Sequence, residues 1–203
     1  IDGTKTYRLG PAVLCLGFEF LAPVDLPEIA GPALEELRDR TGASAHLAVR
    51  DRDEIVYLCR VASRSTLTSS IRIGSRLAAH GSSMGRVLLA DLSMDGLSSL
   101  YFGHRFRRYT DQTPANLEEL REMLDDDAKR GYVLSRSYHE RGVVSVAAAI
   151  RDTTGDAVAA INITAAENSI AAVALEGTIK DDVVETAQTV SSWLGAITHA
   201  SGK

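Results

Sequence analysis

The chain has 203 residues, 45% hydrophobic and 24% charged, and its 22 basic and 27 acidic residues give a formal net charge of −5. At about 150 residues per domain, this length predicts one domain plus a short appendage, and the average composition excludes collagen, a coiled coil and wholesale disorder. No run of about 18 apolar residues is present to span a membrane. The acidic net charge makes the chain a poor candidate for binding nucleic acid through its overall electrostatic field.

The first 21 residues are predicted to form a short tail and then a helix from Pro11. Apolar residues cover most of this helix surface, more than an isolated amphipathic helix needs. We therefore expect the helix to pack on a partner, most simply another subunit. Because the chain begins with Ile1 rather than Met, we also expect it to be a fragment of a longer protein.

Helical spacing of apolar residues predicts a helix over 27–41, which Gly42 ends. Alternating residues then predict a β-hairpin of strands 45–49 and 55–59. A third, polar strand is expected from Ser65 to Ile73, where Gly74 ends it.

A loop of small residues, 81–85, leads into a helix over 83–90. Further helices are expected near 93–101 and 114–130, two closing strands at 143–151 and 157–164, and a final helix at 179–199. This order of elements predicts an α+β domain built on a mostly antiparallel sheet.

Signatures of enzymatic chemistry are scarce. None of the five histidines pairs at the spacing of a helical metal site, and the chain has no HExxH, GxSxG or phosphate-loop motif. The two cysteines, Cys15 and Cys59, fit neither a disulfide framework nor a zinc site, so a reducing, cytoplasmic location is expected. We therefore expect neither a metal nor another cofactor.

Two local features allow both a structural and a functional interpretation. The loop at 81–85 leaves backbone amides at a helix start, where they either accept a ligand carboxylate or merely follow a serine N-cap. On the closing hairpin, Ser145, Asn162 and Thr164 lie on sheet faces, where they either bond neighbouring backbone or line a pocket of neutral hydrogen-bonding groups. The residues alone decide neither case.

Motifs along the whole chain follow one order. They are Tyr7-Arg8-Leu9-Gly10, Asp25-Leu26 through Leu37 with Thr41-Gly42, Ile73 to Leu77, Ser82 to Ala90, Tyr109 to Thr113, Arg130-Gly131-Tyr132, and Gly142 to Ala148. In this order they resemble the effector-binding domain of the IclR family of bacterial transcription regulators. The segments Ser82 to Arg86 and Ala160 to Asn162 are similar to the branch that controls aromatic-acid and β-ketoadipate catabolism.

The resemblance implies an α+β fold with a GAF-like, curved, mostly antiparallel sheet flanked by helices. Residues 1–21 would be a wing end and linker helix, and 22–203 the effector-binding domain of a transcription regulator. Operator DNA would be bound only through an N-terminal winged helix-turn-helix that this chain lacks. Family members form dimers that pair into tetramers, and we expect the same here.

The resemblance also implies a site for a small carboxylic acid between the sheet and the loop that starts the 83–90 helix. Backbone amides of Ser83 and Met84 would meet the ligand carboxylate. The side-chain positions that are typically Asp, Cys, Ser and Ser in members binding small keto acids are occupied here by Ser135, Ser145, Asn162 and Thr164. All four differ, which argues against a glyoxylate- or pyruvate-like effector.

The expected apolar walls of this site are Leu77, Met84 and Val143. Because charged side chains are scarce in the predicted set, a ligand with one carboxylate and extra oxygen functions, an aromatic acid such as a hydroxybenzoate or a keto acid, is favoured. A second carboxylate would need a cation, and the nearest candidates in the sequence are Arg72, Arg76 and Arg136.

The alternative class is a GAF-fold enzyme, for example a redox enzyme that uses Cys59. A reactive thiolate needs a cationic neighbour, yet Arg60, the adjacent residue, points to the opposite face of a strand. We therefore expect Cys59 to be a packing residue and the domain not to be an enzyme.

Overall fold

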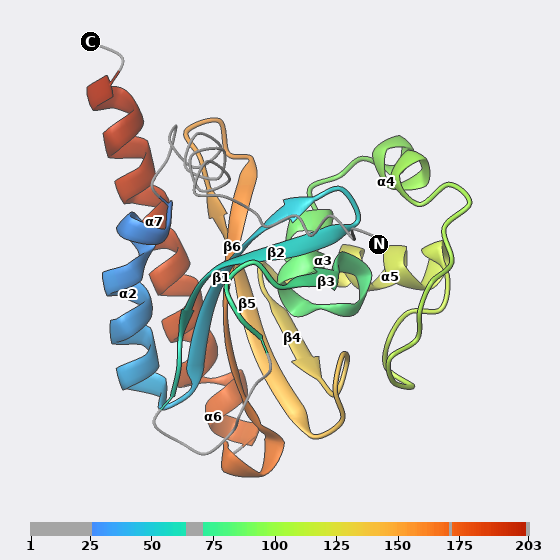
Figure 1. Ribbon diagram of the computed structural model, residues 1–203, viewed down its shortest axis with the longest axis horizontal. Helices are drawn as coiled ribbons and strands as arrows, with labels where there is room; N and C mark the ends of the chain where they lie inside the picture. The colour runs from blue at the N-terminus through green and yellow to red at the C-terminus, as the bar shows by residue number, and fades with distance from the viewer. Residues whose placement is uncertain (1–25, 64–70, 171, 202–203) are drawn as a thin grey trace, which may run out of the picture.

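The computed structural model describes residues 26–63, 71–170 and 172–201. Their strands form a six-stranded sheet in the order β3-β2-β1-β6-β5-β4, in which every neighbouring pair is antiparallel. The strand bounds are β1 Ser44–Asp51, β2 Glu54–Val61, β3 Arg76–Ala78, β4 Val133–Arg136, β5 Val143–Arg151 and β6 Ala157–Ala166. The expected α+β class with a curved antiparallel sheet is confirmed (Figure 1).

Helices cover both faces of this sheet. In Figure 1 the blue α2 and red α7 lie together on one side, and the green α3 and yellow α5 lie on the other. The helix bounds are α2 Leu26–Thr41, α3 Ser83–Leu89, α4 Met94–Leu100, α5 Leu117–Arg130, α6 Ala172–Glu176 and α7 Thr178–Ser201, with 3-10 turns η1 at Ala79–Gly81 and η2 at Glu167–Ser169. No helix in the described ranges is both long and apolar enough to cross a membrane.

Each sheet face has its own hydrophobic core, because successive residues of a strand point to opposite faces. Leu47, Val146 and Ile161 belong to the core under α2 and α7. Ala48 and Ala147 belong to the core under α3 and α5. On β1, β5 and β6 the residues that join this second core are alanines, and the same face carries the polar side chains of the site.

Most predicted elements are confirmed with small changes of bounds. The hairpin at 45–59 is β1 and β2, the closing strands are β5 and β6, and the final helix is α7. Asn116 caps α5 by accepting a hydrogen bond from the amide of Glu119, so this helix begins three residues later than expected.

Three local predictions need correction or addition. The expected third strand ran to Ile73, but the described part of that segment is a loop with a turn at Ile73-Gly74, and the strand that pairs with β2 is Arg76–Ala78. The short strand β4 and helix α6 were not predicted. The expected wing end and linker helix of 1–21 and most of the polar strand lie outside the described residues.

Candidate functional site

A cavity of ≈ 60 Å³ lies between the sheet face that carries the polar side chains and the start of α3. Seven of the eight predicted site residues line it, brought together from β3, α3, β4, β5 and β6: Leu77, Ser83, Ser135, Val143, Ser145, Asn162 and Thr164. Met84 is the exception, since its side chain is 1% exposed and packs in the core under α3 and α5. The expected apolar wall from Met84 is therefore not observed.

Strand register explains why these polar groups meet. Ser135 on β4 pairs with Ser145 on β5, and Ser145 pairs with Thr164 on β6. Thr164 in turn pairs with Ser44 on β1. In antiparallel sheets, paired residues project to the same face with their Cβ atoms about 4.5–5.5 Å apart. A row of four hydroxyl side chains therefore crosses four strands on the face that α3 covers.

Asn162 lies in the adjacent row and joins these hydroxyls into one network. Its amide nitrogen Nδ2 lies 2.9 Å from Ser145 Oγ, 3.2 Å from Thr164 Oγ1 and 3.4 Å from Ser83 Oγ. The hydroxyls of Ser83 and Ser145 are 2.8 Å apart. On its other side, Asn162 Oδ1 lies 3.0 Å from Nδ1 of the buried His46. The polar groups of the hairpin therefore line a cavity, as the functional interpretation predicted, and within the described ranges they bond one another rather than neighbouring backbone.

The start of α3 confirms the serine N-cap predicted for the small-residue loop, and the binding of a ligand by its amides stays a prediction. Ser82 is the N-cap, and its Oγ accepts a hydrogen bond from the Gly85 amide at 3.0 Å. The amides of Ser83 and Met84 precede the first intrahelical bond and have no hydrogen-bond partner within the described ranges. A serine cap and amides available to a ligand therefore occur together.

Gly85 is required because α3 passes very close to the 3-10 turn η1. A Cβ at Gly85 would overlap backbone atoms of Ala79, which cannot move as a side chain can. We expect Gly85→Ala to lower the free energy of unfolding by about 1–3 kcal/mol, as overpacking does, measured by urea denaturation. Gly195→Ala in α7 is the matched control, since its added Cβ would meet only Thr153 Cγ2 at 3.5 Å, an ordinary van der Waals contact. This control should gain about 0.5–1 kcal/mol, and a Gly85→Ala domain as stable as the wild type would contradict the prediction.

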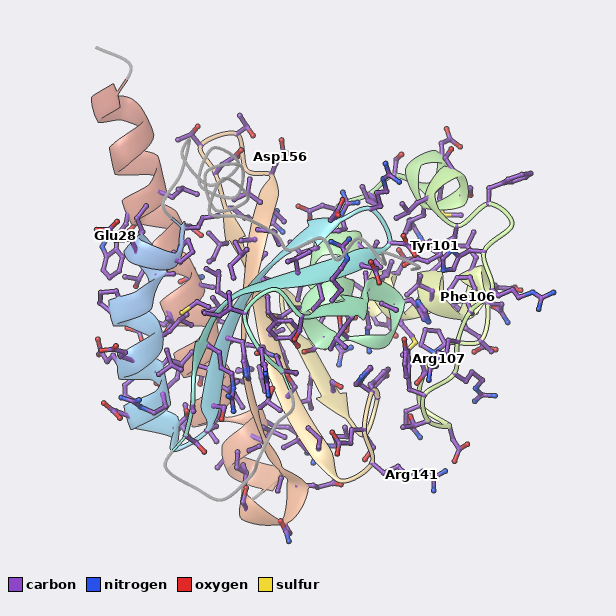
Figure 2. The ribbon with its side chains drawn as sticks, viewed as in Figure 1. Glu28, Tyr101, Phe106, Arg107, Arg141 and Asp156 are labelled. Atoms are coloured by element: carbon purple, nitrogen blue, oxygen red, sulfur yellow. The ribbon has the colours of Figure 1, made fainter. Side chains whose placement is uncertain are left out.

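Six cavity residues were not predicted: Tyr57, Gly81, Ser82, Tyr138, His139 and Glu140. Tyr57 reaches the cavity from β2, and the last three belong to the β4–β5 connection, whose Arg141 is labelled at the lower edge of Figure 2. Alternation along 55–59 was a usable signal for Tyr57. The connection has no periodicity that would place its side chains.

The segment between α4 and α5 packs against the β4–β5 connection, which forms the outer wall of the cavity. Tyr101, Phe106 and Arg107 lie on this segment (Figure 2). The hydroxyl of Thr113 donates to the Tyr138 carbonyl at 2.6 Å, and the rings of Tyr109 and His139 have centroids 4.3 Å apart. The wall that closes the cavity is therefore packed between sheet and loop rather than free in solvent.

The cavity's electrostatics are close to neutral. Burial lowers the pKa of His139 and raises that of Tyr57, so both favour their uncharged forms. Arg76 binds Asp51 and Glu54, and Arg136 binds Glu167 and Glu176. None of Arg72, Arg76 and Arg136 lines the cavity. Its lining offers hydroxyls, an amide and backbone N–H groups, and its one carboxylate side chain, Glu140, is exposed.

A metal centre finds no support in the described ranges, where no three His, Cys, Asp or Glu side chains gather to hold an ion. Cys59 pairs with Leu47 on the face under α2, whereas Arg60 pairs with His46 on the cavity face. This arrangement agrees with the expected opposite orientation of the two side chains. Burial raises the pKa of the Cys59 thiol, which disfavours the nucleophilic thiolate.

Fold and cavity together define an α+β domain with a small, neutral, hydrogen-bonding site on its sheet. Comparison with known proteins adds the family: residues 18–192 match the model described as "Bacterial transcriptional regulator IclR C-terminal". The chain is 32% identical over 163 residues to the Pca regulon regulatory protein of Pseudomonas putida, covering 80% of this chain and 56% of that protein. The chain belongs to the IclR family and contains its C-terminal, effector-binding domain.

Solved structures agree with this assignment. The putative transcriptional regulator RHA06195 from Rhodococcus sp. RHA1 superimposes with a TM-score of 0.85 at 33% identity, covering 93% of this chain and 77% of that one. The inducer-binding domain of the PobR transcription factor from Acinetobacter, a double mutant in complex with 3-hydroxybenzoic acid, gives 0.75 at 26% identity, covering 81% and 97%. The chain spans about three fifths of the length of the curated relatives it matches.

Proposed function

We propose that this domain senses a small carboxylic acid and, through that binding, controls DNA binding by a transcription regulator. The observation that carries the proposal is the largely buried, uncharged network of Ser83, Ser145, Asn162 and Thr164 beside the amides of Ser83 and Met84, which have no hydrogen-bond partner in the described part of the chain. Hydrogen-bond donors beside a helix start favour an anionic oxygen. This proposal includes the predicted hydrogen bonds from the Ser83 and Met84 amides to the ligand carboxylate.

The charge of the cavity favours a ligand with one carboxylate. A second buried carboxylate would need a cation, and no Arg or Lys side chain lines the cavity in the described part of the chain. We therefore favour an aromatic or keto acid with additional oxygen functions. The complex of PobR with 3-hydroxybenzoic acid makes hydroxybenzoates the first compounds to test.

Ligand entry requires the outer wall to move. The cavity of ≈ 60 Å³ is smaller than the roughly 300–1,000 Å³ of ordinary ligand pockets. The β4–β5 connection carries Tyr138 and His139, and its ends are Ser137 and Gly142, with φ of 58° and 75°. These backbone angles lie in the left-handed region, which a non-glycine residue such as Ser137 occupies at a cost. We propose that ligand binding displaces this connection outward.

Asn162→Ala tests the location of the site. The variant removes the amide that joins three hydroxyls, so we expect the affinity for the effector to fall by about 1–3 kcal/mol. A thermal-shift screen of hydroxybenzoates, keto acids and dicarboxylates would identify the ligand, and calorimetry would measure the loss. Ser145→Ala is the companion variant. Unchanged affinity in both variants would place the site elsewhere in the molecule.

A sensor role is favoured over an enzymatic one. The relatives named above are transcription regulators, and the raised pKa of Cys59 gives a redox mechanism no ready nucleophile. Blocking the thiols with iodoacetamide and measuring ligand binding separates the two classes, because a sensor retains its affinity. Loss of a measurable turnover on thiol blocking would instead support an enzyme.

The remaining partners are part of the same proposal. We propose dimers that pair into tetramers, because two-fold symmetric proteins match palindromic operators. Contacts to operator DNA would come from a winged helix-turn-helix outside this chain, since a net charge of −5 provides no evident neutralisation of phosphates. A cytoplasmic location follows from this role.

A further inference from the structure

His46 lies directly behind the polar network without lining the cavity. It pairs with Asn162 across β1 and β6, its residue is 1% exposed, and its ring contacts Tyr57 edge to face with centroids 5.6 Å apart. Its Nδ1 is 3.0 Å from Asn162 Oδ1. The described residues provide no partner for its other ring nitrogen, Nε2, which is also buried.

The hydrogen-bond chain through Asn162 has two possible directions. In the first, His46 Nδ1–H donates to Asn162 Oδ1, and both amide protons of Nδ2 donate to serine or threonine oxygens. In the second, the amide is reversed, Nδ2 donates to an unprotonated Nδ1, and the hydroxyls donate to Oδ1. The tautomer of His46 therefore decides which way the amide of Asn162 points.

The surroundings of His46 select the first direction. The reversed chain would put the proton of His46 on Nε2, where a buried N–H would have no acceptor, a rare and costly arrangement. Arg60 also pairs with His46 across β1 and β2, and its own Nε is buried without a partner in the described ranges. Burial and the positive charge of Arg60 both lower the pKa of His46, so the ring is neutral and carries a single proton.

The direction of the chain sets the polarity of the cavity wall. When Asn162 donates to the hydroxyl oxygens, the protons of Thr164 and of one serine of the Ser83–Ser145 pair remain without an acceptor in the described part of the molecule. The wall then presents O–H donors. In the reversed direction the hydroxyl protons would be used by Asn162, and the wall would present lone pairs that repel an anion.

We propose that His46 is a positioning residue that fixes the Asn162 amide with Nδ2 toward the hydroxyls, and thereby makes the cavity select a carboxylate over an uncharged, donor-bearing analogue. Only the second half of this proposal, the selection of a carboxylate, rests on the proposed function. Its first half, the tautomer, is a property of the protein without ligand.

The first test is nitrogen NMR of the domain with ¹⁵N-labelled histidine, with the His46→Gln spectrum used for assignment. We expect a protonated Nδ1 and an unprotonated Nε2 for His46 at neutral pH. A protonated Nε2 would overturn the proposal. This result does not depend on any ligand, so it is decided even if the proposed function fails.

The second test measures selectivity by calorimetry, with 3-hydroxybenzoate and 3-hydroxybenzamide as probes. We expect the wild type to prefer the carboxylate and His46→Phe to reduce the ratio of affinities about tenfold, while His46→Gln, which can still donate to Oδ1, retains most of it. An unchanged ratio in a folded His46→Phe domain would contradict the positioning role. If the wild type binds neither probe, the selectivity half of the proposal falls, and the NMR result alone decides the orientation of Asn162.

Discussion

Asp127→Ala is expected to lower the free energy of unfolding by about 3–5 kcal/mol, because it leaves a buried guanidinium without its counter-ion. The side chains of Arg86 and Asp127 are 2% and 1% exposed. Arg86 Nε donates to Asp127 Oδ2 at 2.8 Å, and Nη2 donates to the same oxygen. Among the described residues, Arg86 without the carboxylate would retain the ring of Tyr138, 4.6 Å from its guanidinium carbon.

Two comparisons make this prediction specific. Asp126→Ala on the same helix removes a carboxylate that is 69% exposed and binds only Lys129, so its effect should stay within about 0.5 kcal/mol. The double variant Arg86→Met with Asp127→Leu should recover most of the loss, since apolar replacement of a buried pair is often neutral or stabilising. Urea denaturation measures all three variants. A loss below about 1 kcal/mol for Asp127→Ala would show that Arg86 finds another partner.

The Arg86–Asp127 pair also connects the core to the site. Arg86 belongs to α3, whose first residues border the cavity, and it lies against Tyr138 of the outer wall. Asp127 belongs to α5 and also binds Arg130 at 2.7 Å. The ion pair therefore fixes α3, α5 and the β4–β5 connection relative to one another, which is the arrangement that shapes the cavity.

Sequence periodicity predicted the long elements of this fold because their own residues specify them. Strands β5 and β6 have nine and ten residues, enough for alternation to show. Strand β3 has three residues and β4 has four. Such short strands are determined by hydrogen bonding to the neighbouring strand rather than by their own pattern. The pattern therefore predicted the third strand too early in the chain and gave no signal for β4.

The site was predictable where family motifs and strand alternation coincide. Ser135, Ser145, Asn162 and Thr164, which the sequence assigned to one site, line the same cavity, and their role in ligand binding stays a prediction. His46 was not singled out, because its contact with Asn162 depends on the register between β1 and β6, which joins residues 116 positions apart. For Met84 the predicted apolar wall was wrong, because its side chain turns into the core, and the role of its amide stays a prediction.

Acidification is expected to destabilise the domain through its buried histidines. Burial lowers the pKa of His46 to about 4, and it also lowers the pKa of His80 and His139. In the unfolded chain these histidines titrate near 6.5. Between the two values the unfolded state binds more protons than the folded state, so the free energy of unfolding falls as the pH is lowered from about 6.5 toward 4.

For His46 alone, a pKa of about 4 in the folded state corresponds to a loss of about 2 kcal/mol between pH 7 and 4.5, at 1.36 kcal/mol per pKa unit. Carboxylates also begin to titrate at the acid end, so the informative quantity is the difference between the wild type and His46→Gln, whose residue 46 cannot bind a proton. Urea denaturation at a series of pH values should show a shallower acid loss for His46→Gln. If His46→Gln loses stability as steeply as the wild type does, the pKa of His46 is not lowered in the folded domain and the prediction is wrong.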